Sequence, residues 1–234
     1  MEPIIECKNL IKNFGQGEVI VQALRGVDLV IDPGDFMAMA GPSGSGKSTL
    51  LNLIGGLDRP TSGTIEVEGL SVQDLSMTEL SRLRRDRIGF IFQSYNLIPV
   101  LTALENAEYV LMLQGVSTRE RREKVRSILQ EVGLEGLEKR FPRELSGGQQ
   151  QRVAIARAIV SDPALVLADE PTANVDSKTA SALLDLMSRL NEEKGATFLF
   201  STHDRSVMKR AKKLLFLKDG QISDGDMARE VLES

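Results

Sequence analysis

The stretch GPSGSGKST, residues 41–49, restricts the possible folds of this chain more than any other feature. It fits the pattern G-x-x-x-x-G-K-[ST], a glycine-rich loop whose backbone N–H groups surround phosphate oxygens. The apolar segment 35–40 precedes the loop as a buried strand, and the apolar run 50–54 follows it as a helix. This order is the context that the pattern requires, and it disfavours a chance glycine turn. The predicted phosphate-binding residues are Gly41, Pro42, Ser43, Gly44, Ser45, Gly46, Lys47, Ser48 and Thr49.

The residue types in this loop have separate predicted roles. Glycine allows the backbone to turn tightly with no Cβ between an N–H group and a phosphate. Lys47 brings a compact positive charge to the β- and γ-phosphates, and the Ser48 hydroxyl is placed to bind Mg²⁺. The helix that follows points its positive N-terminal end at the same phosphates. The expected ligand is therefore a nucleoside triphosphate with Mg²⁺.

Two acidic residues follow another apolar segment of the chain. The run 164–168 reads as a buried strand, and Asp169 and Glu170 come directly after it. Because side chains alternate along a strand, one carboxylate can hold the metal through its water shell while the next polarises a water molecule. The alternative is a solvated strand end, which the phosphate loop in the same chain disfavours.

The motif LSGGQ, residues 145–149, begins a further predicted helix. Ser146 is placed as the N-cap and Gln149 as its partner in a capping box. Capping leaves Gly147 and Gly148 unexplained, because each glycine in a helix costs about 1 kcal/mol relative to alanine. Close approach of another group, such as a phosphate, would offset that cost.

Strands and helices alternate along the chain. An antiparallel N-terminal region is expected, with a turn at 15–17, and the later strands imply a largely parallel sheet covered on both faces. The predicted class is therefore α/β, with one domain: a core of residues 1–93 and 161–234, and a helical insertion at 94–160. Strands are expected at 4–10, 19–24, 27–31, 64–68, 88–92, 164–168, 197–201 and 214–217, and helices at 78–85, 102–113, 117–132 and 177–193.

Composition excludes several other classes of protein. The net charge of −4 argues against bulk electrostatic binding to nucleic acid, and the mixed charges around Arg82–Arg87 read as a solvated surface. The single cysteine, Cys7, cannot form an internal disulfide and fits a reducing compartment. Neither a signal peptide nor a run of about 18 apolar residues is apparent, so any membrane role is expected to act through a partner.

Taken with the phosphate loop, the LSGGQ motif resembles the signature of ATP-binding-cassette (ABC) ATPases. The other motifs of that family follow in order between residues 14 and 203, which is most of the chain. The sequence departs from the commoner family pattern at Phe14, Ala173 and Val175, and none of these changes removes a charged or catalytic group. The matched positions outside the phosphate loop are Phe14, Gln93, Ser146, Gly147, Gly148, Gln149, Asp169, Glu170, Asp176 and His203.

The resemblance implies a role for each matched group. Phe14 would stack on adenine, Asp169 and Gln93 would hold Mg²⁺ together with Ser48, and Glu170 would be the general base. His203 would contact the γ-phosphate, with Lys47 and Gln93 completing the catalytic set. Asp176 lies in the segment equivalent to the family's D-loop. The signature residues Ser146–Gln149 would close over ATP held by a second copy of the chain.

The same resemblance implies partners and a location. Segments 55–63, 84–93 and 96–106 are similar to ATPases of the lipoprotein-release and macrolide-export group, which pair with permeases that have a large extracytoplasmic domain. The chain would then be a homodimer around two ATP molecules, attached through its permease to the cytoplasmic face of the cell membrane. The transported substrate cannot be read from this chain, because the permease selects it.

Other functions remain as alternatives. An importer ATPase often has an additional C-terminal regulatory domain, and a non-transport ABC protein would need tandem cassettes or a coiled-coil insertion. A GTPase is disfavoured because no N-K-x-D motif occurs. An inactive interaction module is disfavoured because Lys47, Asp169, Glu170 and His203 are all present.

Overall fold

The computed structural model describes residues 2–16 and 19–223, which form two compact units. Among the described residues, the first unit comprises 2–16, 19–82 and 197–223, and the second comprises 83–196. Helix α2 (Met77–Arg87) extends across the boundary at residue 82. The predicted helical insertion, 94–160, lies entirely in the second unit, together with two strands and a further helix.

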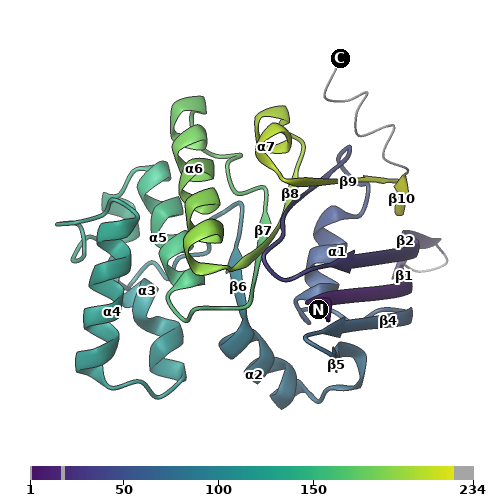
Figure 1. Cartoon of the computed structure of the whole chain (residues 1–234), viewed down its shortest axis with the longest axis horizontal. Coiled ribbons are helices and arrows are strands. Elements are labelled where there is room, and N and C mark those ends of the chain that lie inside the picture. The colour runs from purple at the N-terminus through teal and green to yellow at the C-terminus, as the bar shows by residue number, and fades with distance from the viewer. Residues whose placement is uncertain (1, 17–18, 224–234) are drawn as a thin grey trace. The chain divides into compact units, whose positions relative to one another are not determined.

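An antiparallel sheet makes up one part of the first unit, with the strand order β2-β1-β4-β5 (Figure 1). Strand β1 pairs with β2 on one side and with β4 on the other. The predicted antiparallel N-terminal region is thus confirmed. The strands are β1 (Ile5–Gln16), β2 (Val19–Ile31), β4 (Ser62–Val67) and β5 (Leu70–Ser71), and a 3₁₀ turn, η1 (Val72–Asp74), follows β5.

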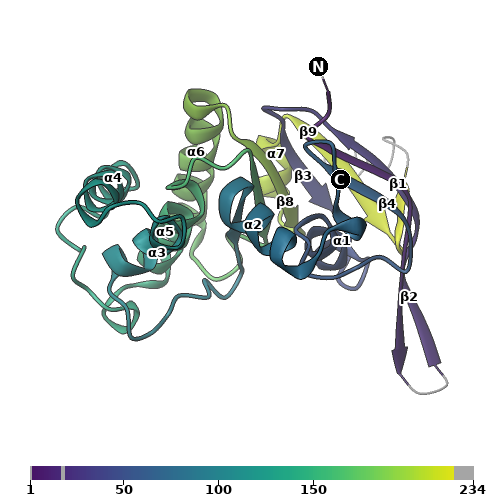
Figure 2. The same cartoon turned by 90° about the horizontal axis from the view of Figure 1, so that it is seen from below.

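Strands β1 and β2 are longer than the sequence predicted, and together they form the extended ribbon of Figure 2. The pairing register shifts between Cys7 and Leu10, and Asn9 has a left-handed backbone with φ 46°. On the facing strand Gly26 has φ 82°. These irregularities interrupt the apolar alternation, so the sequence suggested strand ends where the pairing in fact continues. Of the predicted turn, Gly15 and Gln16 belong to β1, and Gly17 lies outside the described residues.

Parallel strands form the other part of the first unit, in the order β10-β9-β3-β8. Strand β3 runs parallel to both β8 and β9, whereas β10 is an antiparallel edge. Every residue of β3 is buried, and the Phe36 ring lies 4.6 Å from that of Phe200 and 5.6 Å from that of Phe198. The elements are β3 (Phe36–Ala40), α1 (Lys47–Ile54), β8 (Thr197–Thr202), α7 (Arg205–Arg210), β9 (Lys213–Lys218) and β10 (Gln221–Ser223).

The second unit contains a parallel strand pair and a group of helices (Figure 1). Helix α3 packs against α4 and α5, and α5 packs against β6 and α6. These parallel strands and those of the first unit confirm the predicted α/β class. The elements are β6 (Ile88–Ile91), α3 (Ala103–Leu113), α4 (Thr118–Glu131), the 3₁₀ turn η2 (Pro142–Glu144), α5 (Gly147–Ile159), β7 (Leu165–Asp169) and α6 (Ser177–Lys194).

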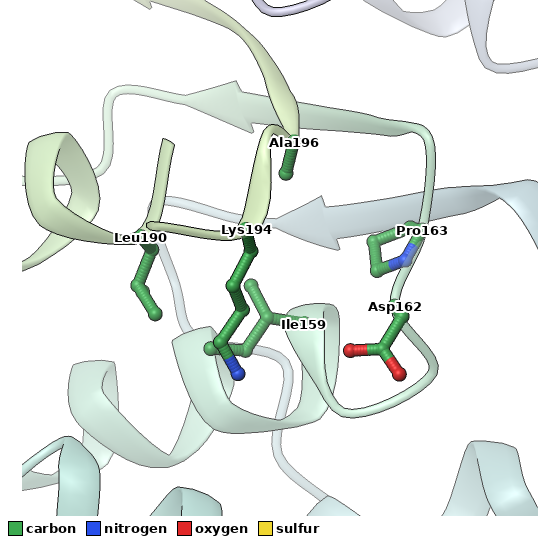
Figure 3. A pocket seen from close by; sticks show the side chains of 6 residues that line it. All are labelled: Ile159, Asp162, Pro163, Leu190, Lys194 and Ala196. Carbon is green, nitrogen blue, oxygen red and sulfur yellow. The ribbon is translucent and has the colours of Figure 1, made fainter. Parts of the chain in front are cut away.

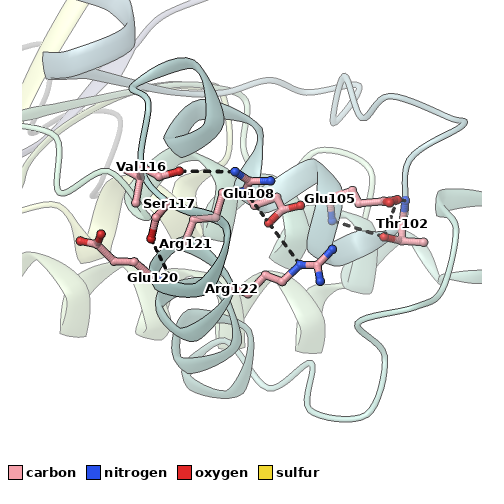
Figure 4. A network of polar contacts seen from close by, with 8 residues as sticks. All are labelled: Thr102, Glu105, Glu108, Val116, Ser117, Glu120, Arg121 and Arg122. Carbon is pink, nitrogen blue, oxygen red and sulfur yellow. Dashed lines mark hydrogen bonds and ion pairs between the residues drawn. The ribbon is translucent and has the colours of Figure 1, made fainter.

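A polar network joins α3 to α4 inside the second unit (Figure 4). The buried Glu108 carboxylate lies 3.0 Å from Arg121 Nε and 4.0 Å from Arg122 Nε. Thr102 and Glu105 form a full capping box at the start of α3, and Ser117 accepts a bond from the Glu120 backbone N–H at the start of α4. Both helices therefore begin at fixed positions, and the ion pairs set how they lie against each other.

No helix in the described part of the chain combines the length and the apolar character that crossing a bilayer would require.

Candidate functional site

The phosphate loop connects β3 to α1 with a backbone that only glycine adopts easily. The φ angles are 149° at Gly41, 79° at Gly44 and 107° at Gly46. A Cβ on Gly41 would lie 2.0 Å from the Leu217 carbonyl oxygen, and one on Gly46 would lie 2.6 Å from that of Ala23. Neighbouring strands therefore hold this loop closely, and glycine is required by space as well as by conformation.

The positive charge of the loop has a fixed position. Lys47 is the first residue of α1 and is buried, and its Nζ donates to the carbonyl oxygens of Gly41 at 2.7 Å and Pro42 at 3.0 Å. The N-cap of α1 is Gly46, which supplies no side-chain acceptor. Helices α3, α4, α5 and α6, in contrast, are each capped by a side-chain oxygen. A helix that begins behind a glycine loop without a side-chain cap suits an external anion at its N-terminus.

A buried hydroxyl in the same loop also fits a phosphate ligand. Among the described residues, Ser45 Oγ is buried without a hydrogen-bond partner. A buried polar atom without a partner is costly, so such an atom in a glycine cradle suits a ligand that brings acceptor oxygens. The residues of this loop therefore fit the triphosphate of a nucleotide.

His203 directly follows β8, the strand next to the one that leads into the phosphate loop. Strands β3 and β8 pair in parallel, with Ala40 opposite Thr202. Gly41 and His203 are the residues that follow, so both emerge at the carboxyl edge of adjacent strands. This edge is where ligands bind in open α/β sheets. The structure thus places His203 and the phosphate loop at the ends of neighbouring strands.

A parallel strand pair in the second unit carries three further predicted residues. Strands β6 and β7 pair with Ile91 opposite Ala168, so Gln93 and the acids Asp169 and Glu170 emerge at the same edge. Asp169 and Glu170 are half-buried, and Gln93 is exposed. Glu170 has φ 47°, a left-handed conformation that is uncommon outside glycine. Such strain concentrates at functional sites, and here it turns the chain sharply at the predicted base.

The signature helix α5 begins as predicted. Ser146 is its N-cap: the Ser146 hydroxyl accepts from the Gln149 backbone N–H at 3.3 Å, and Gln149 Oε1 accepts from the Ser146 N–H at 2.9 Å. The close approach expected at the two glycines is present, but it comes from this chain. A Cβ on Gly147 would lie 2.8 Å from the Tyr95 hydroxyl, and one on Gly148 would lie 2.5 Å from Thr179 Cγ2.

Asp176 has a structural contact that the sequence did not predict. It is the N-cap of α6, and its carboxylate accepts from the backbone N–H groups of Lys178 and Thr179 and from the Thr179 hydroxyl at 2.6 Å. The hydrogen bond from the Thr179 side chain, followed by those from the backbone, lowers the pKa of the Asp176 carboxyl. Asp176 therefore holds the start of α6 and, through Thr179, the surface that meets Gly148.

Phe14 lies in β1 and is 44% exposed, so it is not a core residue. Lys12 Nζ lies 4.8 Å from the ring centroid, a cation–π distance. The same ammonium pairs with Asp58 at 2.7 Å and donates to the Arg59 carbonyl at 2.8 Å. Burial alone would raise the pKa of Asp58, but the bonds from Lys12 and the Arg59 N–H outweigh it and lower that pKa. The Phe14 ring is thus supported on one face.

Replacement of Lys12 by methionine is expected to raise the KM for ATP about two- to fivefold and to leave kcat unchanged. The change removes a cation–π contact of about 0.5–1 kcal/mol while it retains a long apolar stem. Steady-state ATPase assays over a range of ATP concentrations measure both constants. Lys8→Met, at an exposed lysine paired with Glu6, is the matched control. A loss confined to kcat would contradict a role of Lys12 in supporting the Phe14 ring, which is predicted to stack on the base.

Several residues with specific contacts lie outside the predicted motifs. Lys12 and Phe14 lie on the same face of β1, because side chains alternate along a strand and one residue separates them. This alternation could have identified Lys12 from the sequence. Tyr95, Asn174 and Arg157 join segments that are far apart in the sequence, and no local pattern identifies such contacts.

Two cavities of the second unit are separate from all of these groups. One has a volume of about 310 Å³ and lies between the ends of α5 and α6 (Figure 3). The other has about 500 Å³ and is lined by residues of α3, α4 and the loop that follows α4. No predicted site residue is among the residues that line them. The candidate site therefore consists of open strand edges and helix starts and not of these cavities.

Comparison with known proteins agrees with this set of motifs. Residues 24–173 match the family described as ABC transporter. An ABC transporter ATP-binding protein of Methanocaldococcus jannaschii is 45% identical over 97% of this chain and 98% of its own length. The lipoprotein-releasing system ATP-binding protein LolD of Alcanivorax borkumensis is 45% identical over 93% of this chain and 96% of its own length.

A longer relative and a solved structure extend the comparison. The macrolide export ATP-binding/permease protein MacB of Hyphomonas neptunium is 46% identical over 94% of this chain, but the match covers only 34% of that protein. The dimeric post-hydrolysis structure of the M. jannaschii cassette bound to ADP and Pi has a TM-score of 0.88 and 46% identity. That match covers 94% of this chain and 97% of the other. The chain therefore belongs to the ABC transporter family and is one of its ATP-binding, ATP-hydrolysing subunits.

Proposed function

We propose that two copies of this chain close around two Mg²⁺–ATP and thereby drive a separate membrane permease. The observation that carries this proposal is the start of α1, which has no side-chain cap and lies behind the glycine loop, together with the exposed Ser146 at the start of α5, which the family resemblance assigns to the other half of the site. Each offers half of a nucleotide site. A solved relative that covers nearly the whole chain is itself described as a dimer with ADP and Pi bound.

In this dimer, one protomer supplies the phosphate loop and its partner supplies the signature residues. Lys47 holds the β- and γ-phosphates, and Phe14 stacks on the base. Ser146, Gly147, Gly148 and Gln149 close over the same nucleotide from the other copy. ATP then joins the two protomers, because the signature residues of one copy contact the nucleotide only when the phosphate loop of the other copy holds it.

The chemistry is the removal of the γ-phosphate by water. Glu170 accepts a proton from the attacking water, and His203 holds the γ-phosphate at the edge that it shares with the loop. Loss of the γ-phosphate removes the group that bridges the two protomers, and the dimer loosens.

Mg²⁺ fits the side chains that are available. Ser48, Gln93 and Asp169 offer a hydroxyl, an amide and a carboxylate, the oxygen ligands that Mg²⁺ prefers. No group of three or more histidine, cysteine or acidic side chains arranged for a metal occurs among the described residues. A metal held mainly by phosphates, water and a few protein oxygens agrees with that finding. When bound, it neutralises charge that develops on the phosphates.

The permease is proposed to be of the lipoprotein-release or macrolide-export type. This follows from the similarity to LolD and MacB over more than nine-tenths of the chain. The chain would then lie at the cytoplasmic face of the membrane through its contact with the permease. An importer ATPase remains the second candidate, because ATPases of different ABC transporters share this fold: cbiO1, described as part of the ABC transporter complex cbiONQ, matches the whole chain with a TM-score of 0.88 at 28% identity.

Co-expression with a candidate permease is expected to yield a complex that co-purifies and hydrolyses ATP about tenfold faster than the chain alone. The physical reason is that a bound permease holds two protomers at high effective concentration. The measurement is the ATPase rate in detergent or nanodiscs, with the Glu170→Gln complex as the background control. Stimulation that requires an external solute-binding protein would instead support the importer.

A further inference from the structure

Hydrogen bonds join two of the predicted site loops inside the second unit. The loop after β6, residues 93–96, and the loop after β7, residues 170–176, contact each other through Tyr95 and Asn174. The Tyr95 hydroxyl donates to the Asn174 carbonyl oxygen at 3.2 Å, and Asn174 Nδ2 donates to the Gln93 carbonyl oxygen at 2.8 Å. These two bonds connect the loop that carries Gln93 to the loop that begins at Glu170.

The start of α5 is part of the same contact. A Cβ on Gly147 would lie 2.8 Å from the Tyr95 hydroxyl and 3.3 Å from the Asn174 carbonyl oxygen. Gly147 has no positive φ, so glycine is needed here for space alone. The Tyr95 hydroxyl therefore lies between the signature helix and the Asn174 backbone, against the atoms of both.

Arg157 fixes the loop that presents Tyr95. Its guanidinium donates to the carbonyl oxygens of Tyr95 at 2.9 Å and Asn96 at 2.5 Å. Both residues have left-handed backbones, with φ 59° and 48°, which a non-glycine chain adopts only when its surroundings enforce it. Arg157 lies on α5, so the helix that carries the signature also shapes the loop after β6.

We propose that Tyr95 and Asn174 are positioning residues that lock the Gln93 loop, the signature start of α5 and the Glu170 loop into one surface. This inference rests on the proposed dimer, in which the signature start faces the ATP of the partner. This surface holds Ser146 at a fixed position relative to Gln93 and Glu170 while the partner's nucleotide binds.

A double-mutant cycle tests the contact itself. Gly147→Ala is expected to lower the Tm by about 3–6 °C, because the new Cβ meets the Tyr95 hydroxyl. In a Tyr95→Phe background that oxygen is gone, and the nearest remaining atoms are the Asn174 carbonyl oxygen at 3.3 Å and a ring atom at 3.8 Å, so the same substitution should lower the Tm by less than half as much. Thermal unfolding of the four proteins measures the coupling. Equal losses in both backgrounds would overturn the proposed contact.

Activity tests the positioning role. Tyr95→Phe is expected to lower kcat about two- to tenfold and to weaken ATP-driven dimerisation of the Glu170→Gln protein by a similar factor. The affinity of the monomer for a fluorescent ATP analogue should not change. Tyr109→Phe is the matched control, since Tyr109 is the other tyrosine of the chain and is 38% exposed on α3.

The outcomes separate this inference from the proposed function. If Glu170→Gln dimerises with ATP and Tyr95→Phe changes neither dimerisation nor kcat, the positioning role is wrong and the dimer stands. If Glu170→Gln forms no dimer with ATP, the nucleotide sandwich is wrong, and the locked surface loses the partner that it was proposed to meet. Reduced kcat with weaker ATP binding by the monomer would also overturn positioning, because it would indicate a general loss of structure.

Discussion

Replacement of Glu170 by glutamine is expected to reduce ATP turnover about 10²-fold or more and to leave ATP binding intact. Glutamine has nearly the shape of glutamate but cannot accept a proton from water. Glu170 follows β7 and is half-buried, so the replacement keeps the packing of the strand end. With hydrolysis blocked, ATP should hold two protomers together, and size-exclusion chromatography with and without ATP should show the shift from monomer to dimer.

The chain offers a control for the unusual backbone at this position. Glu68 is another glutamate with a left-handed conformation, φ 49° against 47° at Glu170, and it is exposed. Glu68→Gln therefore repeats the same chemical change on the same backbone geometry away from the proposed site. It should hydrolyse ATP at the normal rate. A Glu170→Gln protein that also turns over normally would show that another group is the general base.

Replacement of Ser146 by arginine is expected to block hydrolysis, about 10²-fold or more, while the monomer still binds ATP. Ser146 is exposed at the start of α5, so a long charged side chain there would occupy the surface that must meet the partner's nucleotide. ATP binding by the monomer depends on the phosphate loop and should be unchanged. Equilibrium binding of a fluorescent ATP analogue and steady-state ATPase assays measure the two effects separately.

Loss of the helix cap must be distinguished from the blocked surface. Ser117 caps α4 by the same type of bond, in which its hydroxyl oxygen accepts from the Glu120 backbone N–H, so Ser117→Arg removes a cap of about 1 kcal/mol outside the signature. That variant should be slightly less stable and fully active. If the Ser146→Arg monomer failed to bind ATP, the two half-sites would belong to one chain, and the proposed sharing between copies would be refuted.

Local chemistry made the main site motifs predictable. The glycine positions of the phosphate loop, the two acids at the end of β7 and the Ser146 capping box each depend on a few neighbouring residues, and the structure contains all of them. The parallel strands also placed Gly41 beside His203, because successive α/β units deliver their loops to one edge.

Contacts between distant segments were not predictable in the same way. The sequence indicated that Gly147 and Gly148 need a close neighbour, and a phosphate was the obvious choice. The nearest atoms instead belong to Tyr95 and Thr179, which lie 52 and 31 residues away along the chain. Only the folded arrangement of loops brings these groups together. The full length of β1 and β2 was also not predicted. A bulge breaks the alternation of apolar and polar residues from which strands are recognised in a sequence.

The bonds from Lys47 to its own loop have a consequence for how a nucleotide binds. A free lysine side chain loses about 1.5–2 kcal/mol of conformational entropy when it is immobilised. Here the ammonium is already fixed by two carbonyl groups of the loop that it completes. That entropy is lost when the chain folds and not when the ligand arrives. The loop is thus preorganised, and an arriving triphosphate meets a charge that needs little rearrangement.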